Sequence, residues 1–256
     1  MSEMKKCDVA IIGGGIGGLM AAYRLKQNTP DVSIIITERG NTLENRHCPA
    51  GKNNGCVHCK TCSITSGFAG AGAFSDGKFN LGTAYGGTLG EELGDDVANQ
   101  YINEVDKILN KYCTSGIPKV YKSNEALKLK CIQNNLRLLD MNVKHLGTDN
   151  NYLTMQNLIN ALGEHGVEMY SFYDCDTVEK TENGYMLDYT NGEKIAAEKI
   201  IIATGRGGAN FVANFCRSFG VHMRSNYVDI GVRVEMKDII WKEFSDQIYE
   251  PKILYK

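Results

Sequence analysis

The opening stretch of the chain places a helical pattern between two short apolar runs. Residues 9–12, Val-Ala-Ile-Ile, form an uninterrupted apolar run that is long enough for one buried parallel strand. Apolar residues then recur with helical spacing over 19–25, and Pro30 stands where this helix is expected to have stopped. A second apolar run, 33–37, follows. Strand, helix and strand in this order predict a βαβ unit with a parallel sheet.

Glycines fill the predicted turn between the first strand and the helix, which reads GGGIGG over residues 13–18. Gly13 permits a sharp turn, Gly15 lets a pyrophosphate approach the backbone, and Gly18 lets the helix pack closely on the sheet. The free N–H groups at the start of the helix are expected to face the phosphates. We therefore predict a dinucleotide site that includes Gly13, Gly15, Ile16, Gly17 and Gly18.

An acidic residue closes the second predicted strand. Glu38 follows Gly18 by twenty positions, where a carboxylate can accept hydrogen bonds from both ribose hydroxyls of an adenosine. An acid here favours the unphosphorylated ribose of FAD or NAD over that of NADP. Arg39, the next residue, is a second candidate contact and blurs that choice.

The middle of the chain changes from helical to strand patterns. Amphipathic patterns predict helices over 92–112, 123–139 and 154–165, with Ser123 as the N-cap of the second. Residues 167–202 alternate as strands do, and Asn-Gly pairs at 183–184 and 191–192 mark hairpin turns between them.

These patterns predict an α/β, Rossmann-like, doubly wound fold in three layers, with a parallel sheet, a β-meander and a helical insertion. We expect a discontinuous nucleotide-binding domain over 1–90 and 167–215, which includes a cysteine- and glycine-rich loop at 46–90. Residues 91–166 would be the helical insertion, and 216–256 the start of a second, substrate-binding domain.

Composition restricts the environment and the partners. Of the 256 residues, 43% are hydrophobic, and the net charge is −2, so nothing indicates a nucleic-acid partner or a membrane surface. The first strand leaves no room for a signal peptide, and five glycines interrupt the apolar stretch over 9–22. Nine cysteines without a secretion signal indicate a reducing compartment, so we expect a cytoplasmic protein.

Four of the cysteines form a C-x7-C-x2-C-x2-C cluster at Cys48, Cys56, Cys59 and Cys62. One interpretation is a metal site: the spacing resembles that of iron–sulfur ligands, and zinc is allowed by ligand count. A second is a redox-active dithiol such as Cys59 and Cys62. The third is a loop of free thiols without a metal. Clustered intracellular cysteines usually bind or react, which favours the metal site.

Small residues fill the loop after the cysteines, which reads GFAGAGAFSDGK over 67–78. Chains keep such glycine-rich loops where backbone lies against a ligand, so Gly70, Gly72 and Ser75 are candidate contacts. Asp76 and Lys78 are its chemically active side chains. His145, in the polar segment 144–150, is a further candidate for proton transfer, beside a turn-and-cap interpretation of the same segment.

The chain resembles a family of bacterial and archaeal FAD-dependent dehydrogenases, the NAD(P)/FAD-dependent oxidoreductases, within the glutathione-reductase-like flavoprotein superfamily. The segments that carry the resemblance span nearly the whole chain, and the one from the cysteines to the SDGK sequence is the most specific. They are IIGGGIGGLMAAYRL (11–25), CVHCKTCSITSGFAGAGAFSDGKFNL (56–81), KHLGTDN (144–150), IIATGRGG (201–208) and VDIGVRVE (228–235).

The resemblance implies a non-covalent FAD and hydride transfer, with NAD(P)H as a possible electron donor. It implies that the ADP part lies on residues 13–18 and Glu38, and that Ala203, Thr204 and Gly205 lie near the dinucleotide. Arg206 follows them and is a candidate for phosphate binding. The loop at 70–78 would lie near the pyrophosphate or the flavin. The partner would be a small-molecule substrate or a nicotinamide.

The end of the chain departs from the pattern of that superfamily. A Gly-Asp strand end is expected there, and none of Asp229, Asp238 and Asp246 follows a glycine. The last residues, 251–256, read as the middle of a strand, so we expect a truncated chain whose FAD site is completed by a missing half or a partner chain. Two alternatives to a flavin dehydrogenase are a non-catalytic dinucleotide-binding module and a flavin-dependent tRNA-modifying enzyme.

Overall fold

The computed structural model describes residues 4–52, 55–225, 228, 230–249 and 251–255, and it divides into two compact units. The first unit comprises Met1–Ser75 and Tyr152–Ser225, and the second comprises Asp76–Asn151 and Asn226–Lys256. The predicted domain boundaries at 90, 91, 166 and 215 differ from the boundaries of these two units.

Asp229, which we considered for the missing Gly-Asp pair, lies outside the described residues.

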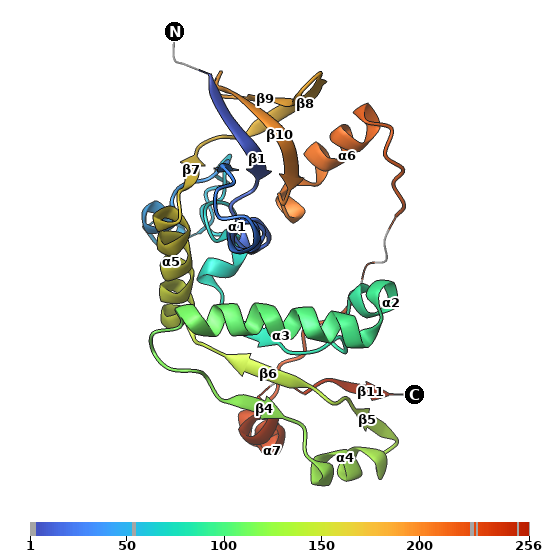
Figure 1. Cartoon of the computed structure of the whole chain (residues 1–256). Coiled ribbons are helices and arrows are strands. Elements are labelled where there is room, and N and C mark those ends of the chain that lie inside the picture. Colours follow the sequence, from blue (N-terminus) through green and yellow to red (C-terminus); the bar gives the residue numbers. More distant parts are fainter. Residues whose placement is uncertain (1–3, 53–54, 226–227, 229, 250, 256) are drawn as a thin grey trace. The chain divides into compact units, whose positions relative to one another are not determined.

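A six-stranded sheet forms the centre of the first unit, in the order β7-β2-β1-β10-β9-β8 (Figure 1). The strands are β1 (Lys5–Ile12), β2 (Ile34–Glu38), β7 (Val167–Ser171), β8 (Cys175–Thr181), β9 (Gly184–Tyr189) and β10 (Lys194–Ile202). Strand β1 pairs in parallel with β2 and β10, and β2 with β7, whereas β8, β9 and β10 form an antiparallel meander. The predicted strands over 167–202 and both hairpin turns are confirmed.

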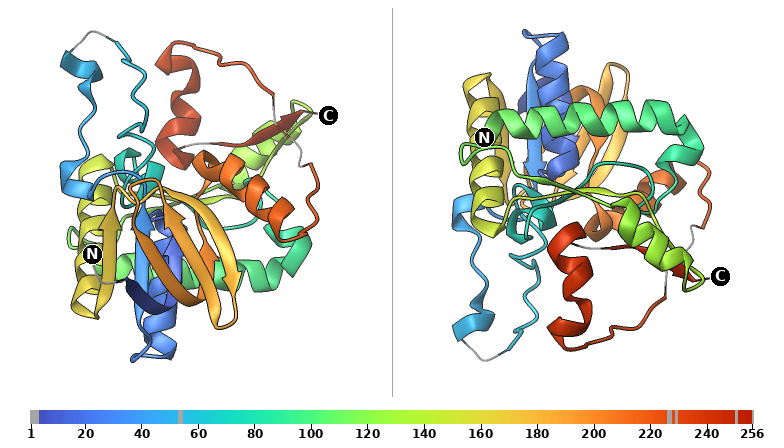
Figure 2. Two further views of the ribbon diagram at one scale, coloured as in Figure 1. Left: turned by 90° about the horizontal axis from the view of Figure 1, so that it is seen from above. Right: turned by 90° about the horizontal axis from the view of Figure 1, so that it is seen from below.

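Apolar side chains cover both faces of this sheet. Ala10, Ile12 and Ile35 pack on one face in a core cluster with residues of the meander, including Leu187 and Ile195. Helix α1 (Ile16–Asn28) packs on β1 and β2 (Figure 2). Its Leu19 and Ala22 are fully buried. Strands buried on both faces explain why β1 and β2 read as continuous apolar runs.

Helices and irregular segments complete the first unit. Helix α6 (Ala209–Ser218) follows β10, and α5 (Thr148–Glu164) begins in the second unit and continues into the first. Residues 46–52 and 55–62, light blue in Figure 2, extend from the sheet. Four short 3₁₀ helices lie in the connections: η1 (Leu43–Asn45), η2 (Pro49–Lys52), η3 (Gly70–Phe74) and η4 (Arg206–Gly208).

The second unit combines two small sheets with helices. Strand β6 (Asn142–His145) lies between β3 (Lys78–Asn80) and β4 (Val120–Lys122), and β5 (Leu136–Leu138) pairs with β11 (Ile253–Tyr255). The prediction of a strand at the end of the chain is thus confirmed for 253–255. The helices are α2 (Leu89–Leu93), α3 (Asp95–Tyr112), α4 (Glu125–Ile132) and α7 (Asp238–Ile248).

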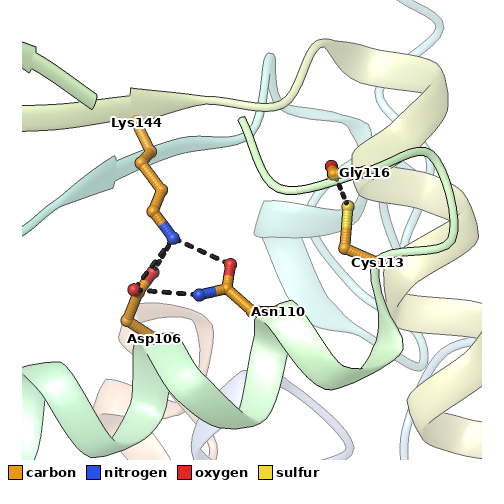
Figure 3. A network of polar contacts seen from close by, with 5 residues as sticks. All are labelled: Asp106, Asn110, Cys113, Gly116 and Lys144. Carbon is orange, nitrogen blue, oxygen red and sulfur yellow. Dashed lines mark hydrogen bonds and ion pairs between the residues drawn. The ribbon is translucent and has the colours of Figure 1, made fainter. Parts of the chain in front are cut away.

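A buried ion pair ties β6 to α3 in the second unit (Figure 3). The Lys144 ammonium lies 2.6 Å and 2.8 Å from the two carboxylate oxygens of Asp106, and it donates to Asn110 Oδ1 at 2.7 Å. Asn110 Nδ2 donates in turn to Asp106 at 3.1 Å. Only 3% of the Lys144 side chain is exposed, and a buried charge requires such a complete set of partners.

Two local predictions over 91–166 are wrong. The helix expected over 123–139 ends at Ile132 as α4, and its N-cap is Asn124, whose side chain accepts a hydrogen bond from Leu127 N. Residues 136–138 form β5 because Leu136 and Leu138 pack into a cluster with Leu127, Cys131 and Ile248. The segment 91–166 also contains β4 and β6, so it is not a helical insertion but part of a mixed α/β unit.

The helices predicted over 92–112 and 154–165 are present, with α2 and α3 covering the first and α5 the second. Among the described residues, none of the helices combines the length and the apolar character that crossing a membrane requires.

The contact between α1 and the sheet gives a direct test of the fold. A Cβ added at Gly18 would overlap the carbonyl oxygen of Gly13, so Gly18→Ala must push the helix off the strand. We expect it to lower the free energy of unfolding by about 1–3 kcal/mol, seen as a lower midpoint in thermal unfolding followed by circular dichroism. Gly163→Ala is the matched control, because a Cβ there meets nothing within 4 Å. Equal midpoints for the two variants would contradict this packing.

Candidate functional site

A cavity of 1120 Å³ opens in the first unit at the carboxyl ends of its central strands. Ile12 ends β1, Thr37 and Glu38 end β2, and Ala203 follows β10, and all four line the cavity. The N-terminus of α1 contributes Gly15, Ile16 and Gly17. In open parallel sheets, ligands bind at this edge, where strand ends and helix N-termini meet.

The glycines of the first turn have different physical reasons to be glycine. Gly13 has φ +111°, and a Cβ there would overlap the Ala203 carbonyl, which makes it a packing position. At Gly15 the backbone is extended, with φ −73°, and a Cβ would meet no protein atom nearer than Gly70 Cα at 3.8 Å. The protein itself therefore allows a side chain at Gly15, and the space that it would enter is the cavity. Gly18 packs on Ile11, and it is not among the lining residues in the described part of the chain.

The chain leaves β10 through a second turn that also lines the cavity, formed by Ala203, Thr204, Gly205 and Arg206. Ala203 N donates to Ile12 O at 2.8 Å, which holds this turn beside the first one. The Thr204 hydroxyl oxygen is buried and has no hydrogen-bond partner among the described residues. Buried hydroxyls are rarely left without a partner, so this position is suited to a ligand atom.

Glu38, for which the sequence predicts a ribose contact, also has a structural role at the cavity wall. Its side chain is 8% exposed, and its carboxylate accepts three backbone hydrogen bonds at 2.9 Å, from Gly14 N, Gly40 N and Gly67 N. A carboxylate offers about four acceptor positions. Glu38 therefore mainly joins three loops at the cavity wall, and about one position is left for a ligand.

Two arginines hold the loops around the cavity. Arg39 donates to Ser66 Oγ at 2.9 Å and 3.2 Å and to Gly207 O at 3.1 Å, so it bridges two lining segments. Arg46, which sequence analysis missed, is 3% exposed and donates to four backbone carbonyls at 2.6–2.9 Å. These carbonyls belong to Ser63, Ile64, Phe68 and Gly70. Burial lowers the pKa of the Arg46 guanidinium.

The glycine-rich loop reaches the cavity only in part. Gly70 and Gly72 line it, and Gly70 has φ +64°, with its Cα turned toward Gly15. Ser75 instead ends η3: its hydroxyl donates to Gly72 O at 2.8 Å, and it is not among the lining residues of the described chain.

The three catalytic candidates lie in the second unit. His145 Nε2 lies 2.9 Å from Asp76 Oδ2, and the imidazole packs on Tyr249 with ring centroids 4.3 Å apart. The hydrogen bond from His145 lowers the pKa of the Asp76 carboxyl. Lys78 pairs with His145 across strands β3 and β6. The structure therefore brings Asp76 and His145 together, which the sequence did not predict, and their catalytic role stays a prediction.

The four clustered cysteines line a second, smaller pocket of the first unit, with a volume of 240 Å³. All four are exposed free thiols, and Pro49, Val57, His58 and Ser63 complete the lining. Hydrogen bonds from Thr65 and Ile64 lower the pKa of the Cys62 thiol. In the part of the chain that the structure describes, no three Cys, His, Asp or Glu side chains are arranged to hold a single metal ion.

Other lining residues carry no motif that sequence reasoning could detect. Asp174 and Asp176 flank Cys175 at the start of β8, and Asn210 and Asn214 project from α6. The four-residue spacing of the two asparagines is the one available signal, because it places both on one face of a helix. Arg46 gave no signal, since an isolated arginine is normally a surface residue.

Three solved structures share this fold at low sequence identity. Glycine oxidase from Geobacillus kaustophilus has 15% identity and a TM-score of 0.50, over 85% of this chain and 59% of its own. The 3-ketosteroid-Δ4-(5α)-dehydrogenase from Rhodococcus jostii RHA1 has 16% identity and a TM-score of 0.51, over 80% and 47%. NikD, an amino acid oxidase of nikkomycin biosynthesis, has 12% identity and a TM-score of 0.50, over 85% and 55%. This chain thus spans about half the length of these proteins.

A family model described as pyridine nucleotide-disulphide oxidoreductase matches residues 7–214. The match covers most of the chain, which therefore belongs to this family. No match was found among curated proteins. Together with the shared fold, the family confirms the predicted α/β, Rossmann-like architecture.

The hydrogen bonds of Arg46 predict a large effect of a mild substitution. Arg46→Lys keeps the positive charge, but one ammonium cannot reach all four carbonyls, so some are left without a donor. We expect a loss of about 2 kcal/mol or more in the free energy of unfolding. Arg24→Lys on the exposed side of α1 is the control, with an expected change below about 0.5 kcal/mol. Thermal unfolding measures both, and equal stability of the two variants would contradict the role given to Arg46.

Proposed function

We propose that this chain binds FAD in the cavity of the first unit and acts in an FAD-dependent oxidoreductase. The observation that carries the proposal is the turn after β1, where Gly15 faces the cavity without any packing reason to be glycine. The family of the chain supports an oxidoreductase. The shared fold with two oxidases and a dehydrogenase is consistent with the same class of reaction.

The size and polarity of the cavity suit a dinucleotide. Sites for drug-sized ligands measure about 300–1,000 Å³, and this cavity, at 1120 Å³, has room for a longer molecule. Helix α1 has no acidic residue in its first turn, so its N-terminal N–H groups attract a pyrophosphate. Arg206, from the turn after β10, adds a positive charge to the same lining.

Individual residues have distinct roles in this proposal. The backbone of residues 15–17 would hold the pyrophosphate, and the remaining acceptor position of Glu38 would receive one ribose hydroxyl. The buried Thr204 hydroxyl would gain the partner that it lacks among the described residues. Gly70 and Gly72 would bring backbone against the ligand from the opposite loop.

A bound flavin supplies hydride and single-electron chemistry, while the protein supplies orientation and exclusion of water. We propose a reduced nicotinamide as the electron donor, in keeping with the family of the chain. The chain itself contributes a cavity whose wall is fixed by buried bonds of Glu38 and Arg46, so bound FAD would meet a largely preformed surface.

Gly15 tests the proposal with little effect on folding. At this position valine has an allowed backbone, and its Cβ makes only an ordinary van der Waals contact with Gly70 Cα, so Gly15→Val should leave the thermal unfolding midpoint of the ligand-free protein nearly unchanged. Its side chain would occupy the place of the pyrophosphate. We expect FAD affinity to fall by a factor of about ten or more, a loss of at least about 1.4 kcal/mol, measured by flavin fluorescence titration.

Gly163→Val is the control for the size of the added side chain, because its Cβ meets nothing within 4 Å and Gly163 lies on α5, outside the cavity lining. It should bind FAD as the unchanged protein does. Tight binding of FAD by Gly15→Val would refute the pyrophosphate position, and no binding by the unchanged protein would refute the FAD proposal itself.

Thr204 gives a test with opposite effects on stability and binding. Thr204→Val removes a buried hydroxyl that has no partner among the described residues, so the ligand-free protein should be as stable as before or more stable. Loss of a hydrogen bond to the ligand should weaken FAD binding by a factor of about ten. Thr204→Ser keeps the hydroxyl and should bind nearly normally. Calorimetric titration of both variants checks this, and equal affinities would exclude a contact between this hydroxyl and FAD.

A further inference from the structure

We propose that Cys48, Cys56, Cys59 and Cys62 hold a [4Fe–4S] cluster in the small pocket of the first unit. This inference goes beyond the proposed function, since binding of FAD requires no cluster. The geometry behind it is a single pocket that all four cysteines line, although they are spread over fifteen residues of chain. The five other cysteines do not line this pocket in the described part of the chain.

The pocket is larger than a single metal ion requires. Its volume of 240 Å³ is several times the roughly 30 Å³ that one water molecule occupies in the liquid. In a zinc site, four thiolates lie about 2.3 Å from one centre, and such convergence is not found among the described residues. An iron–sulfur cluster is bulkier, and each thiolate binds a different iron atom, so its ligands surround a space of greater width.

The spacing of the ligands favours the cluster with four irons. A C-x2-C-x2-C run with a fourth, more distant cysteine is the arrangement that bacterial ferredoxins use for [4Fe–4S] clusters. Here the run is Cys56, Cys59 and Cys62, and Cys48 is the distant ligand, followed by Pro49. His58, between two of the ligands, has φ +51°, a conformation that turns the backbone sharply within the run.

Hydrogen-bond donors reach the sulfur atoms of Cys56 and Cys62, and a positive charge lies near Cys62, which suits the thiolate ligands of a cluster. His58 N lies 3.5 Å from Cys56 Sγ and donates to it. The backbone N–H groups of Ile64 and Thr65 and the Thr65 hydroxyl donate to Cys62 Sγ. Arg46 is close enough to Cys62 for electrostatic attraction. The donors therefore come from the same short segment that carries the ligands.

A hydrogen-bonded turn over residues 62–66 connects the cysteine pocket to the large cavity. Thr65 N and Ser66 N donate to Cys62 O at 3.2 Å and 2.8 Å, and both residues line the cavity. A cluster here would place a carrier of single electrons beside the ligand of the cavity. This position has a functional meaning only if the cavity binds FAD, so that part rests on the proposed function.

The test is a metal analysis of the whole chain purified without oxygen and supplied with ferrous iron and sulfide. We expect about four iron atoms and four acid-labile sulfides per chain, together with a low-temperature electron paramagnetic resonance signal after reduction. Cys59→Ser and Cys62→Ser should each lose most of this iron and the signal. Cys113→Ser is the control, because Cys113 is half-buried in the second unit, where its thiol donates to Gly116 O (Figure 3).

Several outcomes would overturn the proposal: zinc in place of iron, iron without sulfide, a disulfide among the four cysteines, or full iron content in Cys59→Ser and Cys62→Ser. Thermal unfolding of the serine variants without metal shows whether they are folded. Both thiols are exposed, so we expect the substitutions to leave the fold intact. Gly15→Val separates the two proposals. It should keep the cluster while losing FAD, whereas the serine variants should keep FAD while losing the cluster.

Discussion

The carboxylate of Glu38 is the interaction on which the candidate site depends. It accepts backbone hydrogen bonds from Gly14, Gly40 and Gly67, which belong to three separate loops. Burial of a carboxylate costs free energy unless hydrogen-bond donors satisfy its oxygens. Each loop supplies one donor, so a loop that moved away would leave the buried charge short of one hydrogen bond. The cavity wall is therefore fixed by one buried anion. Because these bonds form within the protein alone, the site is organised before a ligand binds, which reduces the entropy cost of binding.

Arg46 complements this anion with a buried cation. Four backbone carbonyls accept from its guanidinium, and the ring of Phe74 lies 4.8 Å from it. Glu38 also attracts this charge. The loop over 63–70 has little apolar surface of its own to bury, since its residues are mostly small or polar. Two buried charges with many backbone partners therefore replace the hydrophobic packing that orders most loops, and they place Gly67 and Gly70 at the cavity.

The sequence predicts the parts of this protein that follow local rules. Apolar runs predicted the strands β1 and β2, and alternation with Asn-Gly turns predicted the meander. The glycine spacing predicted the turn at Gly13. Arg46 and the bonds of Glu38 could not be predicted, because their partners are backbone groups, which every residue carries. The helix predicted over 123–139 failed for another reason. Leu136 and Leu139 continue its helical pattern, but Leu136 and Leu138 pack in a cluster with Ile248, far along the chain, and this segment is a strand. Contacts between residues that are distant in the sequence cannot be detected from a local pattern.

The bonds of Arg46 also connect the two pockets of the first unit. Its partners Ser63 and Ile64 directly follow Cys62, whereas Phe68 and Gly70 belong to the loop that reaches the cavity. One guanidinium therefore holds both ends of the segment 63–70 in place. A single buried arginine thus gives two chemically different pockets a common structural basis.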